Sequence, residues 1–242
     1  MNLNIKNGKI PTTITLPTSK SYANRALILA ALKTGTIKIR NLPQALDVIF
    51  LLKALREIGL EIIEDGRDAL FKNSFPECEQ AHGEGLRVDV GEGGTTARFL
   101  ACMLLKGSQP YTLVLGSRLK DRPWIEFIQM AKDLGAQCEL KGNELFIQGP
   151  IKTKAELKID CARTTQFATG MYLAFSNVMK ITPVNLETSQ SYWEMTLEII
   201  KQIQSGNEYS TPVDWSSASY SLAFAALNQE TFFPGLTKDK YQ

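Results

Sequence analysis

The chain has 242 residues, of which 44% are hydrophobic and 21% are charged, the composition of a globular protein of one or two domains. The net charge of +2 gives no reason to expect nucleic acid or a membrane surface as a partner. No apolar run is long enough to span a bilayer, and residues 1–6 lack the apolar region of a signal peptide. We therefore expect a cytoplasmic protein. Four scattered cysteines predict free thiols, and the only histidine, His82, argues against a His-based metal site or a Ser–His triad.

The stretch 16–32 organises the chain. It predicts a helix that starts after Pro17 and Thr18, and two cations, Lys20 and Arg25, lie near that start. The amino end of a helix carries partial positive charge and free N–H groups, so it prefers anions. Cations and hydroxyls together there predict a bound anion. The alternative is a core helix capped by Ser19, with two solvated basic residues.

Periodicity and turn residues predict the remaining elements in chain order. Strands are expected at residues 3–5, 13–16, 36–40, 60–63, 69–71, 86–90, 111–115, 137–140, 144–147, 156–160, 182–186 and 231–233. After the first helix, which ends near 34–35, helices are expected at 47–58, 97–105, 124–134, 164–177, 192–203 and 216–227.

Three glycines, Gly59, Gly135 and Gly206, end a helix at the same point of a recurring unit. Their spacing of about 70–75 residues indicates an internal repeat of the form strand–helix–strand–helix–strand–strand. Three such units predict one α/β domain from about residue 14 to about 210. The residues after 210 do not fit a fourth unit.

Several helices are predicted to start with hydroxyl residues, at positions 19–21, 95–96, 164–165 and 214–219. Repeat symmetry can bring these starts to one face, where their N–H groups would bind a common anion. Basic residues lie at matching junctions, namely Arg98, Arg118, Lys120 and Arg122. A solvated loop is the alternative for 118–122. The turn 91–94 lacks Gly-Lys-Ser/Thr, which argues against a nucleotide P-loop.

These motifs resemble the enolpyruvyl transferase family. Residues 17–26 (PTSKSYANRA) are similar to its lysine-containing opening motif, and 91–98 (GEGGTTAR) is similar to the Gly-Asn-x-Gly-Thr-x-x-Arg motif of the EPSP synthases. The segments 120–123, 164–167 and 214–220 follow in the family's order. The match covers the whole chain, and the UDP-N-acetylglucosamine enolpyruvyl transferases, which share the fold, match it less well.

The resemblance implies an inside-out α/β barrel of three βαβαββ repeats, with a second domain largely missing. Residues 14–212 would form the complete domain, and 1–13 and 213–242 would be fragments of the second. The implied reaction transfers the enolpyruvyl group of phosphoenolpyruvate to the 5-hydroxyl of shikimate 3-phosphate, in the shikimate pathway to chorismate and aromatic amino acids. It proceeds through a tetrahedral intermediate and releases phosphate. No metal or organic cofactor is implied.

The resemblance also implies residue roles. The catalytic residue would be Lys20, which contacts both substrates. The other residues expected to bind shikimate 3-phosphate are Ser21 and Arg25 at the carboxylate, Thr164, Thr165 and Ser189 at the phosphate, and Gln166 and Tyr192 nearby. Those expected to bind phosphoenolpyruvate are Lys20, Gly94, Arg122 and Gln166, with Thr95 and Arg98 as supports.

The chain departs from the family pattern in places. Glu92 replaces the usual Asn and adds negative charge beside an anion site; Phe99, Thr164-Thr165 and Gln190-Ser191 are further replacements. The family's acidic proton-transfer residues belong to the second domain. We therefore expect a chain that binds shikimate 3-phosphate weakly and is inactive alone. The alternatives are a binding module or half-enzyme completed by a partner chain, and a UDP-N-acetylglucosamine enolpyruvyl transferase. The apolar segment 216–233 is expected to pack against a second copy or partner, or to be mobile.

Overall fold

The computed structural model describes residues 12–242 except 78, 80–84, 188 and 229–230. The helices are α1 (Lys20–Leu32), α2 (Leu46–Glu57), α3 (Gly94–Leu104), α4 (Ile125–Asp133), α5 (Gln166–Phe175), α6 (Gln190–Ser205) and α7 (Trp215–Asn228). The strands are β1 (Ile37–Arg40), β2 (Ile62–Asp65), β3 (Asp68–Phe71), β4 (Leu86–Asp89), β5 (Tyr111–Val114), β6 (Gln137–Lys141), β7 (Glu144–Gln148), β8 (Glu156–Asp160), β9 (Lys180–Val184) and β10 (Glu208–Ser210).

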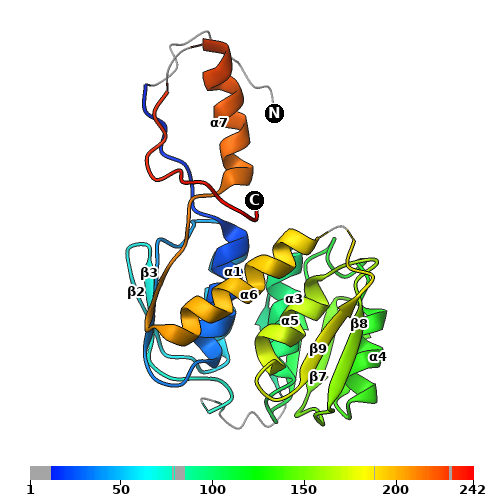
Figure 1. Ribbon diagram of the computed structural model, residues 1–242. Coiled ribbons are helices and arrows are strands. Elements are labelled where there is room, and N and C mark those ends of the chain that lie inside the picture. Colours follow the sequence, from blue (N-terminus) through cyan, green and yellow to red (C-terminus); the bar gives the residue numbers. More distant parts are fainter. Residues whose placement is uncertain (1–11, 78, 80–84, 188, 229–230) are drawn as a thin grey trace.

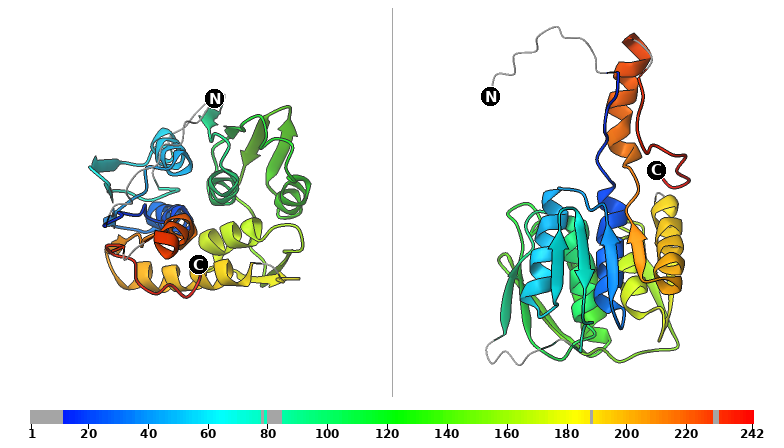
Figure 2. Two further views of the ribbon diagram at one scale, coloured as in Figure 1. Left: turned by 90° about the horizontal axis from the view of Figure 1, so that it is seen from above. Right: turned by 90° about the vertical axis from the view of Figure 1, so that its left-hand side faces the viewer.

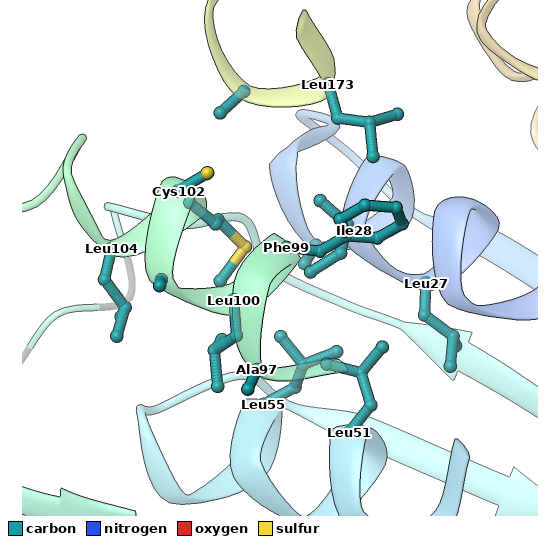
Figure 3. Packing of buried hydrophobic residues seen from close by; sticks show 14 of the residues in the cluster. Leu27, Ile28, Leu51, Leu55, Ala97, Phe99, Leu100, Cys102, Leu104 and Leu173 are labelled. Carbon is teal, nitrogen blue, oxygen red and sulfur yellow. The ribbon is translucent and has the colours of Figure 1, made fainter. Parts of the chain in front are cut away.

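Three helices, α1, α3 and α5, form the interior (Figure 2, left). They are apolar on nearly every face, so each can bury its whole surface against its neighbours. Leu27 and Ile28 of α1 pack near Phe99 of α3 and Leu173 of α5 (Figure 3). The amphipathic helices α2, α4 and α6 bury one face only.

The sheets lie outside these helices (Figure 1), so the fold is α/β with helices inside and strands outside, as the family resemblance implies. Two four-stranded sheets share one pattern, β10-β1-β3-β2 and β4-β5-β7-β6, with one parallel pair and two antiparallel pairs. The third unit differs. Its sheet holds only β8 and β9, which are parallel, and the chain after α6 goes to the first sheet as β10.

The strand predicted at 13–16 is wrong. Among the described residues of this stretch only Thr13 forms a bridge, with Phe232, and the strand predicted at 231–233 is likewise reduced to Phe232. The place beside β1 is taken by β10, with Lys38 opposite Glu208. Alternation of apolar and polar residues indicates a strand, but it does not determine which other strand pairs with it. The strand predicted at 3–5 and His82 lie outside the described residues.

Some boundaries shift for local reasons. β2 starts at Ile62 because Leu60 N still donates to Leu55 O and completes the end of α2. β9 ends at Val184 because Asn185 has a φ of 56°. α3 begins at Gly94, three residues before the prediction.

The last described segment stands apart from the three units. α7 projects from the end of the domain at which α1 starts (Figures 1 and 2), and its Tyr220 and Phe224 are 76% and 61% exposed. Residues 237–242 return to α1, where Tyr22 Oη donates to the Asp239 carboxylate at 3.0 Å and Gln242 Nε2 donates to Ser19 Oγ at 2.8 Å. No helix in the described part of the chain is long and apolar enough to cross a membrane.

Candidate functional site

A pocket of about 560 Å³ lies where helix amino ends meet. Its residues come from the starts of α1, α3, α5 and α6 and from the segment that leads into α7. They are Lys20, Ser21, Arg25, Thr95, Phe99, Arg163, Thr164, Thr165, Gln166, Ser189, Tyr192, Asp214 and Ser216.

The four helices that open on this pocket have unusual amino ends. None of α1, α3, α5 and α6 has a side-chain cap or an acidic residue in its first turn. The helices α2 and α4 also lack side-chain caps, but they carry the acidic residues Asp47 and Glu126 in their first turns. Free N–H groups and aligned helix dipoles at one place form a binding site for anions.

Arg25 reaches the pocket from the second turn of α1 and is only 4% exposed. Its Nε donates to Thr196 Oγ1 at 2.8 Å, and its terminal nitrogens donate to the carbonyls of Ser21 and Tyr192 at 2.8 and 3.2 Å. Burial lowers its pKa to about 10. No carboxylate in the described part of the chain pairs with it, so this buried cation lacks the counter-ion that such a charge normally requires.

A second buried cation, Arg98 of α3, lies beside the pocket. One terminal nitrogen donates to Gln166 Oε1 at 2.5 Å, and Gln166 Nε2 donates to Thr95 Oγ1 at 3.1 Å. The Arg98 Nε atom is buried without an acceptor. Burial, and then the charge of Arg122, lower the Arg98 pKa. These bonds fix Gln166 between α3 and α5.

Gly94 lies at the centre of this group. A Cβ atom added there would lie 2.8 Å from a terminal nitrogen of Arg122 and 3.6 Å from Gln166 Oε1. Only a residue without a side chain lets this guanidinium approach the amino end of α3 so closely. Arg122 forms no ion pair with any described residue. Gly94, Arg98 and Arg122 thus form a second cationic group, joined to the pocket by Gln166 but not part of its lining.

Lys20 is half exposed at the mouth of the pocket. Its Nζ pairs with Asp47 Oδ2 at 2.9 Å, and the backbone carbonyl of Asp47 accepts a hydrogen bond from Thr96 Oγ1. Asp47 therefore holds Lys20 close to the start of α3.

The hydroxyl residues predicted for the site come together here. Thr164 and Thr165 precede α5, Ser189 precedes α6, and Tyr192 lies in the first turn of α6 with its ring centroid 5.7 Å from the Arg25 guanidinium. Neither Thr165 nor Ser189 caps its helix with its side chain. Their hydroxyls can therefore serve a ligand.

The Glu92 carboxylate is held by hydrogen bonds from a neighbouring loop and does not point at the expected anion site. Its carboxylate accepts hydrogen bonds from Ser117 Oγ at 3.0 Å and from the Arg118 backbone N–H at 3.1 Å. Burial by itself raises the Glu92 pKa, but the bonds from Ser117 and Arg118 outweigh it and leave the pKa below its ordinary value. Glu92 thus anchors the loop that carries Arg122.

The sequence interpretation gave no role to Arg163, which lines the pocket next to Thr164 and pairs with Glu126 at 2.7 Å. The signal that could have found it was its position, directly before two hydroxyl residues at a helix start. Asp214 also lines the pocket, but its carboxylate accepts from Ser216 N and Ser217 Oγ at the start of α7. The described residues contain no group of three His, Cys, Asp or Glu side chains that could hold a metal ion.

Comparison with known proteins gives a consistent result. The family model of EPSP synthase (3-phosphoshikimate 1-carboxyvinyltransferase) matches residues 5–205. A 3-phosphoshikimate 1-carboxyvinyltransferase of Vibrio atlanticus is 30% identical, and the match covers 97% of this chain and 62% of that protein. One from Sulfurovum is 32% identical over 90% of this chain and 57% of its own length.

Among solved structures, an EPSP synthase from Acinetobacter baumannii superposes with a TM-score of 0.71 at 19% identity, covering 89% of this chain and 53% of that one. This likeness supports the fold. The chain spans about three fifths of the length of the relatives that it matches.

Proposed function

Because this chain belongs to the EPSP synthase family, we propose that its pocket binds shikimate 3-phosphate. The chain then supplies one wall of a site that transfers the enolpyruvyl group of phosphoenolpyruvate to the 5-hydroxyl. One observation carries this proposal: buried Arg25, without a carboxylate partner, lies among four helix amino ends that lack caps and acidic residues. A ligand with two separate anionic groups would compensate both features.

In this proposal, Arg25 and Ser21 bind the shikimate carboxylate, because a guanidinium matches a carboxylate bidentately. Thr164, Thr165 and Ser189 bind the 3-phosphate with their hydroxyls and with the N–H groups of α5 and α6. The support is their common position at the amino ends of α5 and α6, where Gln166 N already donates to Thr164 Oγ1 at 3.3 Å and neither Thr165 nor Ser189 caps its helix. Gln166 and Tyr192 complete this part of the pocket.

Phosphoenolpyruvate is assigned to the second cationic group. Arg122 and the amino end of α3 at Gly94 would hold it, with Gln166 between the two substrates and Lys20 in contact with both. Arg98 and Thr95 fix Gln166 by hydrogen bonds and so support the group. The Lys20–Asp47 ion pair is exposed, so it costs little to exchange for a substrate anion.

We propose that this chain does not turn over alone. The reaction joins the 5-oxygen to C2 of phosphoenolpyruvate, moves one proton to C3 and later removes one, and expels phosphate. A general acid or base must lie within hydrogen-bond reach of the proton that it moves. Asp214, which lines the pocket, is already bonded at the start of α7. The relatives are longer, and the proton-transfer groups are proposed to belong to the part without a counterpart here.

We propose that residues 14–212 form one domain and that 1–13 and 213–242 belong to a second. Among the described residues, Phe232 N donates to Thr12 O at 2.8 Å and Ile14 N donates to Phe232 O at 3.0 Å. The two fragments therefore pair through Thr12, and Ile14, the first residue of the proposed domain, continues this pairing. The exposed rings of α7 support its role as a contact with a second copy or with a partner chain.

Titration calorimetry of the whole chain tests this function. Shikimate 3-phosphate should bind, shikimate should bind at least tenfold more weakly for want of the phosphate, and a UDP-sugar should not bind. Ser189→Ala should weaken shikimate 3-phosphate binding and leave shikimate binding unchanged. Preference for the UDP-sugar would overturn the proposal, and phosphate release from the substrate pair by the purified chain would refute the inactivity. Phosphate release only after a second chain is added would identify a half-enzyme.

A further inference from the structure

Arg163 lies at the border between two hollows of the molecule. It lines the pocket described above, next to Thr164, and it also lines a smaller cavity of about 150 Å³ between α4 and β8. Its Nη1 atom donates to Glu126 Oε1 at 2.7 Å. Glu126 lies in the first turn of α4 and lines the cavity but not the pocket. The ion pair therefore draws the Arg163 guanidinium to the cavity side of this border.

The ion pair between Arg163 and Glu126 is exposed to solvent. The two side chains are 65% and 49% exposed. Water and salt screen such a pair, so it contributes little to stability and costs little to break. A guanidinium has five N–H donors, and this pair uses one of them. Arg163 can therefore exchange Glu126 for an anion that binds it more strongly.

The charges of the pocket show where such an anion is expected. The cations among its described lining residues are Lys20, Arg25 and Arg163. The proposed function places Arg25 at the carboxylate of shikimate 3-phosphate and Lys20 in contact with both substrates. A phosphate monoester carries about −1.5 to −2 charges at pH 7, whereas hydroxyl and backbone N–H groups carry no full charge. Of the described lining cations, Arg163 alone has no assigned ligand.

The position of Arg163 in the chain matches this requirement. It directly precedes Thr164 and Thr165, the two residues at the start of α5 that are proposed to bind the phosphate. A phosphate held by their hydroxyls would lie beside the residue that carries the guanidinium. Arginine binds phosphate with two parallel hydrogen bonds, and a dianion attracts it more strongly than one carboxylate does. The exchange of Glu126 for the phosphate is therefore favourable.

We propose that Arg163 is a cationic ligand of the 3-phosphate and that Glu126 holds it aside until the phosphate binds. This inference rests on the proposed function and adds a residue to which the family resemblance gives no role. Arg163 then makes the pocket selective for the phosphorylated ligand over shikimate.

Titration calorimetry of the whole chain with shikimate 3-phosphate and with shikimate tests the inference. Arg163→Met should weaken shikimate 3-phosphate about tenfold, the loss of roughly one charge-assisted hydrogen bond, and leave shikimate unchanged. Arg163→Lys keeps the charge but not the planar fork, so its affinity should lie between the two. Glu126→Gln removes the competing carboxylate and should strengthen shikimate 3-phosphate binding up to about fivefold.

Lys158→Met is the matched control. Lys158 is an exposed cation that lines the cavity but not the pocket, so its removal changes the net charge equally and should leave the affinity unchanged. Equal losses in Arg163→Met and Lys158→Met would reveal a general charge effect and overturn the inference. An equal loss of shikimate affinity in Arg163→Met would also overturn it, because Arg163 would then meet the carboxylate.

Two further measurements separate this inference from the proposed function. If Ser189→Ala weakens shikimate 3-phosphate and Arg163→Met does not, the inference fails and the proposed function stands. Inorganic phosphate is a probe that does not depend on the proposed substrate. Arg163→Met should weaken its binding and Lys158→Met should not. Should shikimate 3-phosphate fail to bind, the proposed function fails, and unchanged phosphate binding in Arg163→Met would overturn the inference as well.

Discussion

Positively charged side chains at the two ends of the interior helices have opposite electrostatic surroundings. Beyond the carboxyl ends of α1 and α3, Lys33 Nζ donates to Ile203 O and Lys106 Nζ donates to Ala174 O, both at 2.9 Å. These ammonium groups meet the last carbonyls of α6 and α5, where the helix dipole favours cations. At the amino ends, Arg25 and Arg98 are buried beside dipoles that repel them, without a paired carboxylate in the described part of the chain.

This difference in surroundings distinguishes cations that stabilise the fold from cations that we propose bind a ligand. A cation at a helix carboxyl end gains about 0.3–1 kcal/mol, and the same charge at an amino end loses a similar amount. Burial adds a further cost at Arg25, whose pKa falls to about 10. Burial lowers the pKa of Lys106 at the carboxyl end as well, but there the ammonium donates to a carbonyl at the end of a helix. We therefore propose that the cations at the amino end serve a ligand, whereas those at the carboxyl end stabilise the fold.

The largest expected effect follows from removing the buried cation of the pocket. Arg25→Met should weaken shikimate 3-phosphate binding at least a hundredfold, because charge-assisted hydrogen bonds contribute about 1.5–3 kcal/mol each. Calorimetry measures this, with Lys106→Met at the opposite end as the matched cation control. Equal loss in both variants would contradict a functional difference between the ends.

Inorganic phosphate should stabilise the chain by filling the amino-end site. At a phosphate concentration of 100 times Kd, the expected gain is about 2.7 kcal/mol, which thermal unfolding with increasing phosphate detects. The gain should disappear in a variant that lacks Thr164, Thr165 and Ser189 hydroxyls. If chloride at equal ionic strength gives the same stabilisation, the effect is general screening and not binding.

Lys106→Met should lower the free energy of unfolding by about 1 kcal/mol, the usual contribution of one hydrogen bond. The methionine keeps the packing over the Phe175 ring, from which Lys106 Nζ lies 4.9 Å. Urea unfolding gives the loss. The affinity for shikimate 3-phosphate should not change. A fall in that affinity would contradict the distinction between the two helix ends.

The smallest expected effect concerns Glu92, an acid beside the amino-end loops. Its folded pKa is below the ordinary 4.5, so the bonds to Ser117 and Arg118 stabilise the fold above pH 4.5. This stability is lost as the pH falls through the lower folded value. Glu92→Gln should flatten the unfolding free energy between about pH 5 and 3. If the unfolding free energy of Glu92→Gln depends on pH below 5 in the same way as that of the unmodified chain, other carboxylates determine this dependence.

Local signals were sufficient for most of the fold. The six helices of the three units are confirmed, and so are the strands predicted at 60–63, 69–71, 137–140 and 144–147, because apolar periodicity and the glycines at 59 and 135 indicate them directly. Both strands of the third sheet were predicted, but β10 of the first sheet was not. A three-residue strand such as β10 carries almost no periodicity, and its pairing with β1 depends on a partner 170 residues away.

The motifs identified the residues of the site but not their grouping. Lys20, Arg25 and Gln166 line one pocket, as the motifs led us to expect, and the binding of an anion there stays a prediction. Sequence order could not place Arg98 outside the lining, because that depends on how closely α3 and α5 pack. Close packing is possible at Gly170, where an added Cβ would lie 2.8 Å from Cys102 Sγ.

The parallel pairing of β1 with β10 also affects the order of folding. The first sheet cannot be completed until Glu208–Ser210 has been synthesised, although β1, β2 and β3 are available from residue 71 onward. The second sheet has no such delay, since all of its strands lie between Leu86 and Gln148. During synthesis the middle unit can therefore fold first. In the first unit, one edge of β1 stays unpaired while nearly 140 further residues are synthesised.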